Sequence, residues 1–112
     1  MDFYCNLYWG DGLEKKQKKI LEKLKHGKFQ YDLYLVVLSH NPDNQLEIIH
    51  SGILLQDLFP SEHLLVVGIA KGYDDALLMI EKIVQEVYDN TDGAKVRAYI
   101  VNRQKEYEKN RR

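Results

Sequence analysis

The chain has 112 residues, of which 45% are hydrophobic and one is cysteine, and its formal net charge is −1. This length fits one domain, and the hydrophobic content excludes a disordered chain. A single cysteine excludes an intrachain disulfide and a cysteine-based metal cluster. No run approaches the roughly 20 apolar residues that span a bilayer, and the N-terminal residues lack a secretory-signal pattern. We therefore expect a cytoplasmic protein with no membrane partner.

The charges are distributed unevenly along the chain. Residues 1–28 carry seven lysines against four acids, and residues 103–112 carry five basic residues against two acids. The middle, residues 29–102, carries four basic residues against eleven acids. Opposite charges at the ends and in the middle would attract one copy of the chain to another. Two solvated surfaces without a partner are the alternative interpretation.

Aromatic and apolar residues predict a first strand over residues 3–9, which the Gly10-Asp11-Gly12 turn ends. A helix is expected over residues 12–26, with Asp11 as its N-cap and Gly27 as its stop. One face of this helix is apolar, and lysines cover most of the remaining surface.

The next segment is predicted to form a hairpin. A second strand is expected over residues 31–39, and residues 40–44 have the composition of a turn. Residues 45–54 then return as an antiparallel strand. A helix over residues 45–58 is the alternative, because the apolar residues there also have helical spacing.

Residues 64–70 are apolar at almost every position, which predicts a central strand covered on both faces. A helix is expected over residues 74–89, with an apolar stripe formed by Leu77, Ile80, Ile83, Val84 and Val87. A break at residues 90–93 leads to a last strand over residues 95–101. Residues 103–112 are predicted to form a charged tail that is flexible or partly helical.

The resulting order is strand, helix, strand, strand, strand, helix, strand. Because a helix between two strands of one sheet normally connects them in parallel, this order predicts a ferredoxin-like α+β fold. It would be a two-layer sandwich with an extra central strand or loop, in a single domain over residues 1–102. A three-layer, flavodoxin-like α/β fold is the alternative, although two helices are few for covering both faces of a sheet.

The sheet face away from the helices is predicted to be half apolar and rich in tyrosine. Side chains alternate along a strand, and placing the aliphatic set under the helices leaves Tyr4, Tyr8, Tyr34, Val36, Tyr99 and Val101 on the other face. Tyrosine buries its ring while keeping a polar tip, and exposed patches of this kind are typical of interfaces. We expect this face to pair with another copy, or to be covered by residues 45–60 of the same chain.

Two glycine-containing turns are candidate anion sites. The turn before the second helix lacks a phosphate-loop sequence, and Asp74 and Asp75 would compete with a bound anion. The other candidate consists of Gly10, Gly12, Lys15 and Lys16. A solvated, lysine-rich helix is the simpler interpretation of that segment.

The sequence contains no catalytic motif and predicts no cofactor and no metal. The four histidines lack the paired spacing of a zinc site, and Cys5 lies within an apolar strand pattern. Nucleic-acid binding through the first helix and the tail is opposed by the acidic middle and by a pI of about 6.4.

The leading hypothesis is a non-enzymatic, self-associating domain with a binding or regulatory role, which uses its tyrosine-rich sheet face to form a homodimer or a larger assembly. The alternative is a small enzyme, or an anion- or nucleic-acid-binding protein, with its site at the Gly10-Asp11-Gly12 turn and the lysine-rich first helix.

Overall fold

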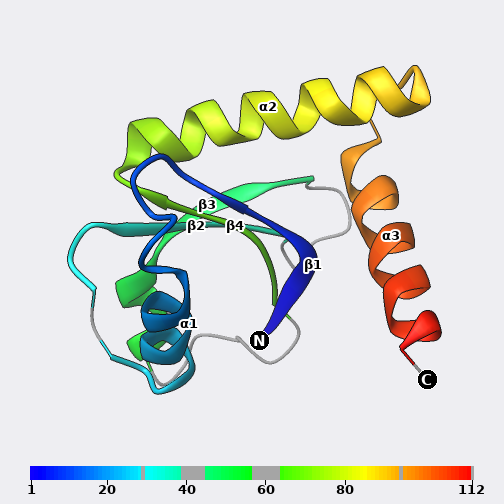
Figure 1. Ribbon diagram of the computed structural model, residues 1–112. Helices are drawn as coiled ribbons and strands as arrows, with labels where there is room; N and C mark the ends of the chain where they lie inside the picture. The colour runs from blue at the N-terminus through cyan, green and yellow to red at the C-terminus, as the bar shows by residue number, and fades with distance from the viewer. Residues whose placement is uncertain (29, 39–44, 57–63, 94, 112) are drawn as a thin grey trace.

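A computed structural model describes residues 1–28, 30–38, 45–56, 64–93 and 95–111. Within these ranges the elements follow in the order β1 (Asp2–Trp9), α1 (Gln17–Lys25), β2 (Leu33–Leu38), β3 (Glu47–His50), the 3-10 helix η1 (Ser51–Leu55), β4 (Leu65–Lys71), α2 (Tyr73–Thr91) and α3 (Val96–Asn110) (Figure 1).

The four strands form one mixed sheet in the order β1-β4-β2-β3. β4 is parallel to β1 and antiparallel to β2, and β3 is antiparallel to β2. The α+β class is therefore confirmed, but the ferredoxin-like order is not reproduced. The strands before and after α1 do not form a parallel pair, since β4 lies between β1 and β2 and runs opposite to β2.

Helices cover both faces of the sheet, so the expected two-layer arrangement is wrong. Figure 1 shows α2 lying across one face and α1 below the other, while α3 descends from the end of α2 beside β1. Neighbouring residues on β2 explain this arrangement: Val36 joins the core under α2 and α3, Val37 joins the core over α1, and neither is exposed. The flavodoxin-like alternative has the right number of layers, but this sheet contains two antiparallel pairs.

The predicted last strand over residues 95–101 is wrong, because this segment begins α3. Val96 and Ile100 are the buried residues of the helix. Residues four apart share one face of a helix, and they also share one face of a strand, so the spacing did not distinguish the two. α3 continues to Asn110, through most of the segment expected to be a flexible tail.

The first helix is shorter than predicted. α1 begins at Gln17, after Lys16, and no side chain caps it, so the expected N-cap at Asp11 is wrong. Residues between β1 and α1 form turns instead: the Leu13 amide donates to the Gly10 carbonyl at 3.4 Å, and the Lys16 amide donates to the Leu13 carbonyl at 3.0 Å.

The central segment forms the expected strand and not the alternative helix over residues 45–58. β3 pairs antiparallel with β2 as expected, and η1 follows it at once. His50 sets this boundary, because its Nδ1 accepts from the Gly52 amide at 3.0 Å and its Nε2 lies 2.7 Å from the Tyr31 carbonyl oxygen. The predicted turn at residues 40–44 lies outside the described residues.

β4 and α2 agree closely with the predicted strand and helix. α2 ends at Thr91, and Asp92 follows in the left-handed conformation with φ of 58°. In the described parts of the chain, no helix combines the length and the apolar character that a membrane crossing requires.

Gly68 permits the close approach of α2 to the sheet, which gives a test of the fold. A methyl group added at Gly68 would collide with the Met79 sulfur and lie 3.3 Å from the Tyr8 Cβ. We expect Gly68→Ala to lower the free energy of unfolding by about 1–3 kcal/mol. Urea unfolding should show a much smaller cost in a Met79→Ala background, because the colliding side chain is gone. Additive effects of the two substitutions would contradict this packing.

Candidate functional site

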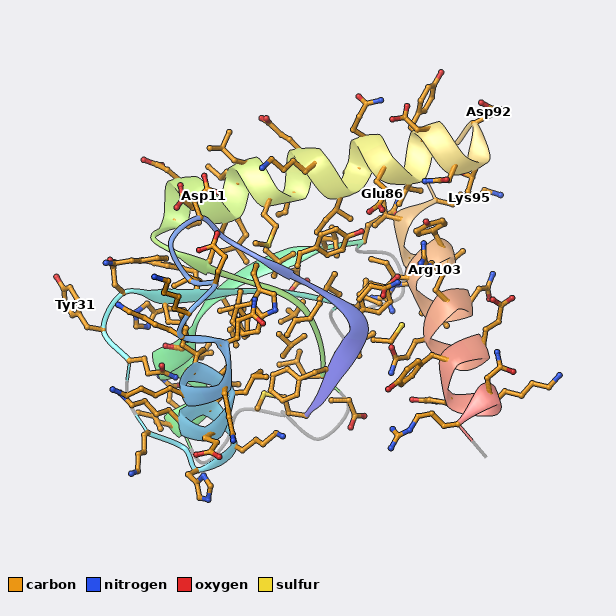
Figure 2. The ribbon with its side chains drawn as sticks, in the orientation of Figure 1. Asp11, Tyr31, Glu86, Asp92, Lys95 and Arg103 are labelled. Carbon is orange, nitrogen blue, oxygen red and sulfur yellow. The ribbon has the colours of Figure 1, made fainter. Side chains whose placement is uncertain are left out.

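Five polar and aromatic side chains meet where α2 and α3 approach β1. We name them the tyrosine cluster: Tyr4 and Tyr8 from β1, Glu86 from α2, and Tyr99 and Arg103 from α3. Figure 2 shows Glu86 and Arg103 reaching from their helices into the angle between them. Tyr4 is almost fully buried, and the other four side chains are partly buried.

Hydrogen bonds and ring contacts connect the members of the cluster in pairs. The Tyr8 hydroxyl donates to the Glu86 carboxylate. The Arg103 guanidinium donates to the Tyr99 hydroxyl at 2.6 Å and lies over the same ring. The Tyr4 and Tyr8 rings are stacked, with centroids 6.3 Å apart. The Tyr8–Glu86 bond joins β1 to α2, and Tyr99 of α3 packs against the core that contains Tyr4.

α3 also occupies the outer edge of the sheet beside β1. The Cys5 amide donates to the Gln104 side-chain oxygen at 2.7 Å. An edge strand carries backbone groups that no neighbouring strand satisfies, and here a helix side chain takes the place of a strand partner. This bond and the tyrosine cluster fix the position of α3 although few of its residues are buried.

The protonation states of the cluster favour a structural role. Burial raises the pKa of Tyr4 to about 12. Burial, and then the bond to Glu86, raises the pKa of Tyr8 further. The bond to Tyr99 raises the pKa of Arg103. Phenols that remain neutral are weak bases and weak nucleophiles, and these raised pKa values keep the Tyr4 and Tyr8 hydroxyls protonated near neutral pH.

A small pocket lies at the carboxyl end of β1, beside the first half of α2. It has a volume of about 70 Å³, and its charged lining residues are Asp11, Asp75 and Lys82. Among the described residues, no group of three or more His, Cys, Asp or Glu side chains is arranged to hold a metal ion.

The structure separates the four residues of the predicted anion site. Gly10 is buried and lines the pocket at the end of β1, but Gly12, Lys15 and Lys16 are exposed and do not line it. The positive φ of 84° at Gly12 identifies it as a turn residue. Two carboxylates in the pocket lining oppose the binding of an anion beside Gly10.

The face predicted to be open is covered by the same chain, so that premise is wrong. Val36 is fully buried in the core under α2 and α3, and Tyr34 lies half-buried against the rings of Tyr73 and His50. Tyr99 and Val101 belong to α3 and pack against this core. Three of the predicted tyrosines, Tyr4, Tyr8 and Tyr99, do come together in the tyrosine cluster.

The apolar residues that were predicted to form one stripe on α2 are divided between two rows in the structure. The helix buries Ala76, Met79, Ile83 and Val87. A second row of apolar residues lies beside the buried one at intervals of four and three; it comprises Tyr73, Leu77, Ile80, Val84 and Tyr88. We name this row the α2 stripe. Four of its members are exposed, and Ile80 is partly buried.

The signal for the α2 stripe was present in the sequence. We expected Leu77 and Val84 to be buried, but they are 43% and 37% exposed. The helix has more apolar positions than one face can bury, and an excess of this kind indicates a second contact surface.

Comparisons with protein families, with curated proteins and with solved structures found no match to this chain. The functional argument therefore depends on the geometry described above.

The buried Tyr4 hydroxyl predicts a loss of stability in alkali. Its pKa is raised from 10.0 to about 12, so its contribution is complete below pH 10 and is lost as the pH rises towards 12. Tyr4→Phe should flatten the decline in the free energy of unfolding by up to about 1.4 kcal/mol per pH unit. Urea unfolding across this range measures it, with Tyr31→Phe, at an exposed position, as the control. An equally steep decline in Tyr4→Phe would be evidence against this role of burial.

Proposed function

We propose that the protein is a self-associating domain with a binding or regulatory role, and that two copies pack through their α2 stripes in antiparallel orientation. The observation that carries the proposal is the exposed apolar row on α2. It replaces the sheet face as the contact surface, because α2 and α3 of the same chain cover that face.

The contacts of α2 place the stripe along one side of the helix. Tyr73, at one end of the stripe, packs against Tyr34 on β2 with ring centroids 5.8 Å apart. The opposite side of the helix carries Glu86, which bonds to Tyr8 on β1. The stripe therefore runs on the β2 and β3 side of α2, above the edge of the sheet formed by β3.

The order of residues in the stripe suits pairing with a second copy. It reads Tyr, Leu, Ile, Val, Tyr, with a tyrosine at each end and aliphatic residues between. A two-fold axis between residues 80 and 81 would bring Tyr73 beside Tyr88 of the other copy, and Leu77 beside Val84. An isologous interface requires a surface that is complementary to itself, and this spacing meets that requirement.

The size of the stripe indicates weak association. From Tyr73 to Tyr88 it extends about 22 Å along the helix, at about 1.5 Å per residue. A contact of that length is close to the lower limit of about 1,000 Å² for a specific interface, so we expect a dissociation constant on the order of micromolar. Transient pairing of this strength is typical of regulatory contacts and would respond to changes in protein concentration.

Charges beside the stripe oppose the pairing and make it depend on salt. Asp74 and Glu81 are exposed and follow members of the stripe along the helix. In a symmetric pair, each copy brings the same acids to the same contact. Because salt screens exposed charges, association should strengthen as ionic strength rises.

Two neighbouring leucines on α2 provide a matched test. Leu77 belongs to the stripe, whereas Leu78 lies about 100° farther round the helix and lines the pocket near β1. Their exposed fractions are 43% and 54%. Leu77→Glu should abolish self-association because it places a charge in the contact, and Leu78→Glu should leave it unchanged.

Sedimentation equilibrium across a concentration series measures the outcome. The wild type and Leu78→Glu should approach twice the 13.2 kDa mass of one chain at high micromolar concentration, while Leu77→Glu should remain a monomer. Circular dichroism checks that both variants keep their helices. A monomeric wild type, or equal loss in both variants, would overturn the proposal.

A further inference from the structure

A cleft lined by the end of α2 and by α3 is a second candidate site, independent of self-association. It has a volume of about 480 Å³. Thr91 and Gly93 form one wall, and the polar residues on α3 are Lys95, Tyr99, Asn102, Arg103 and Glu106. We propose that this cleft binds an organic anion, whose carboxylate or phosphate group is held by Arg103 and Lys95.

Arg103 is positioned before any ligand arrives. Its Nη1 donates to the Tyr99 hydroxyl at 2.6 Å, and its guanidinium lies 5.4 Å from the centre of the Tyr99 ring. A guanidinium has five N–H donors, and this bond uses one of them. Among the described residues its hydrogen-bond partner is a phenol and not a carboxylate. The remaining donors are therefore available to a carboxylate or phosphate, the groups that match the guanidinium fork.

Within the described residues the nearby acids make no hydrogen bond or ion pair with Arg103, although Glu86 attracts its guanidinium electrostatically. Glu86 accepts a hydrogen bond from Tyr8 on the β1 side of the cluster. Glu106 lines the cleft one turn beyond Arg103. No hydrogen bond or ion pair joins Glu106 to Arg103 among the described residues.

Lys95 supplies a second positive charge at the start of α3. Lys95 lies eight positions before Arg103, about 12 Å along the helix. Two long side chains can span this distance by reaching towards each other. Within the described ranges the Lys95 ammonium makes no hydrogen bond or ion pair. Asn102, which also lines the cleft, adds an amide. Along the helix the charged and amide side chains of the lining therefore follow in the order Lys95, Asn102, Arg103 and Glu106.

This layout orients the ligand. Its anionic group lies between Lys95 and Arg103, and its remaining part, neutral or cationic, extends towards Glu106 because a second anion there would be repelled. Small carboxylates and phosphates share the required chemistry, and they differ in charge and in the number of oxygen acceptors.

NMR titration of the ¹⁵N-labelled full chain tests the site, with inorganic phosphate and acetate as separate probes at constant ionic strength. We expect saturable shifts in the backbone amides of α3 near Lys95 and Arg103. The probe that binds more tightly distinguishes a phosphate-type ligand from a carboxylate-type ligand. Each chain should bind one anion, and the Leu77→Glu variant should bind it as tightly as the wild type. The outcome of this binding test is therefore separate from the outcome of the self-association test.

Three substitutions on or beside α3 complete the test. Arg103→Gln and Lys95→Gln should each weaken binding about ten-fold or more. Lys105→Gln changes the net charge equally, but Lys105 is exposed and does not line the cleft, so its affinity should remain within about two-fold of wild type. If the loss of the Arg103 side chain loosens α3, the Lys95→Gln variant still tests the role of positive charge in the cleft. The proposal is overturned if neither probe saturates at about 10 mM, if the shifts centre on α1, or if Lys105→Gln weakens binding as much as Lys95→Gln.

Discussion

Burial of β4 on both faces is the constraint on which the rest of the structure depends. Val66, Val67, Ile69 and Ala70 have no exposed surface. A strand of this kind requires a cover on each side. α1 and η1 cover one face, and α2 and α3 cover the other. Gly68, in the middle of the strand, leaves the space that the Met79 side chain fills.

The two helices that cover the second face of the sheet, α2 and α3, also shape the surface of the molecule. α2 is 19 residues long and carries two apolar rows, but the sheet buries one of them. α3 contributes two buried residues, Val96 and Ile100, and polar contacts to β1 hold it in place. The chain therefore presents two features that its own core does not use, the α2 stripe and the cleft on α3. They share no residue and are proposed to bind different partners.

Much of the fold could be predicted from local patterns. The continuous apolar run at residues 64–70 identified β4, and the periodicity of residues 74–89 identified α2, because in both segments the buried face determines the spacing. Residues 95–101 were misassigned because Val96 and Ile100 share a face in either structure. Packing against β1 stabilises this segment as a helix, and such long-range packing overrides local preference.

The sites were harder to predict than the fold. Alternation along the strands correctly grouped Tyr4 with Tyr8, but Tyr99 reaches them from a helix and not from a neighbouring strand. The cleft could not be predicted, because Lys95 and Arg103 were assigned to a strand and to a tail. The α2 stripe could have been found by noting that six apolar residues remain on α2 after one face is filled, five of them in one row.

The central claim is antiparallel pairing of two α2 stripes, and cysteine cross-linking tests it most directly. In a Cys5→Ala background, a chain carrying both Leu77→Cys and Val84→Cys should form a covalent dimer on mild oxidation, because each new cysteine lies beside the other type in the second copy. Each single variant should remain monomeric, since its two cysteines would be about 10 Å apart along the helices, beyond the roughly 4–7 Å Cα separation of a disulfide. Efficient cross-linking of either single variant, or none in the double variant, would contradict the account.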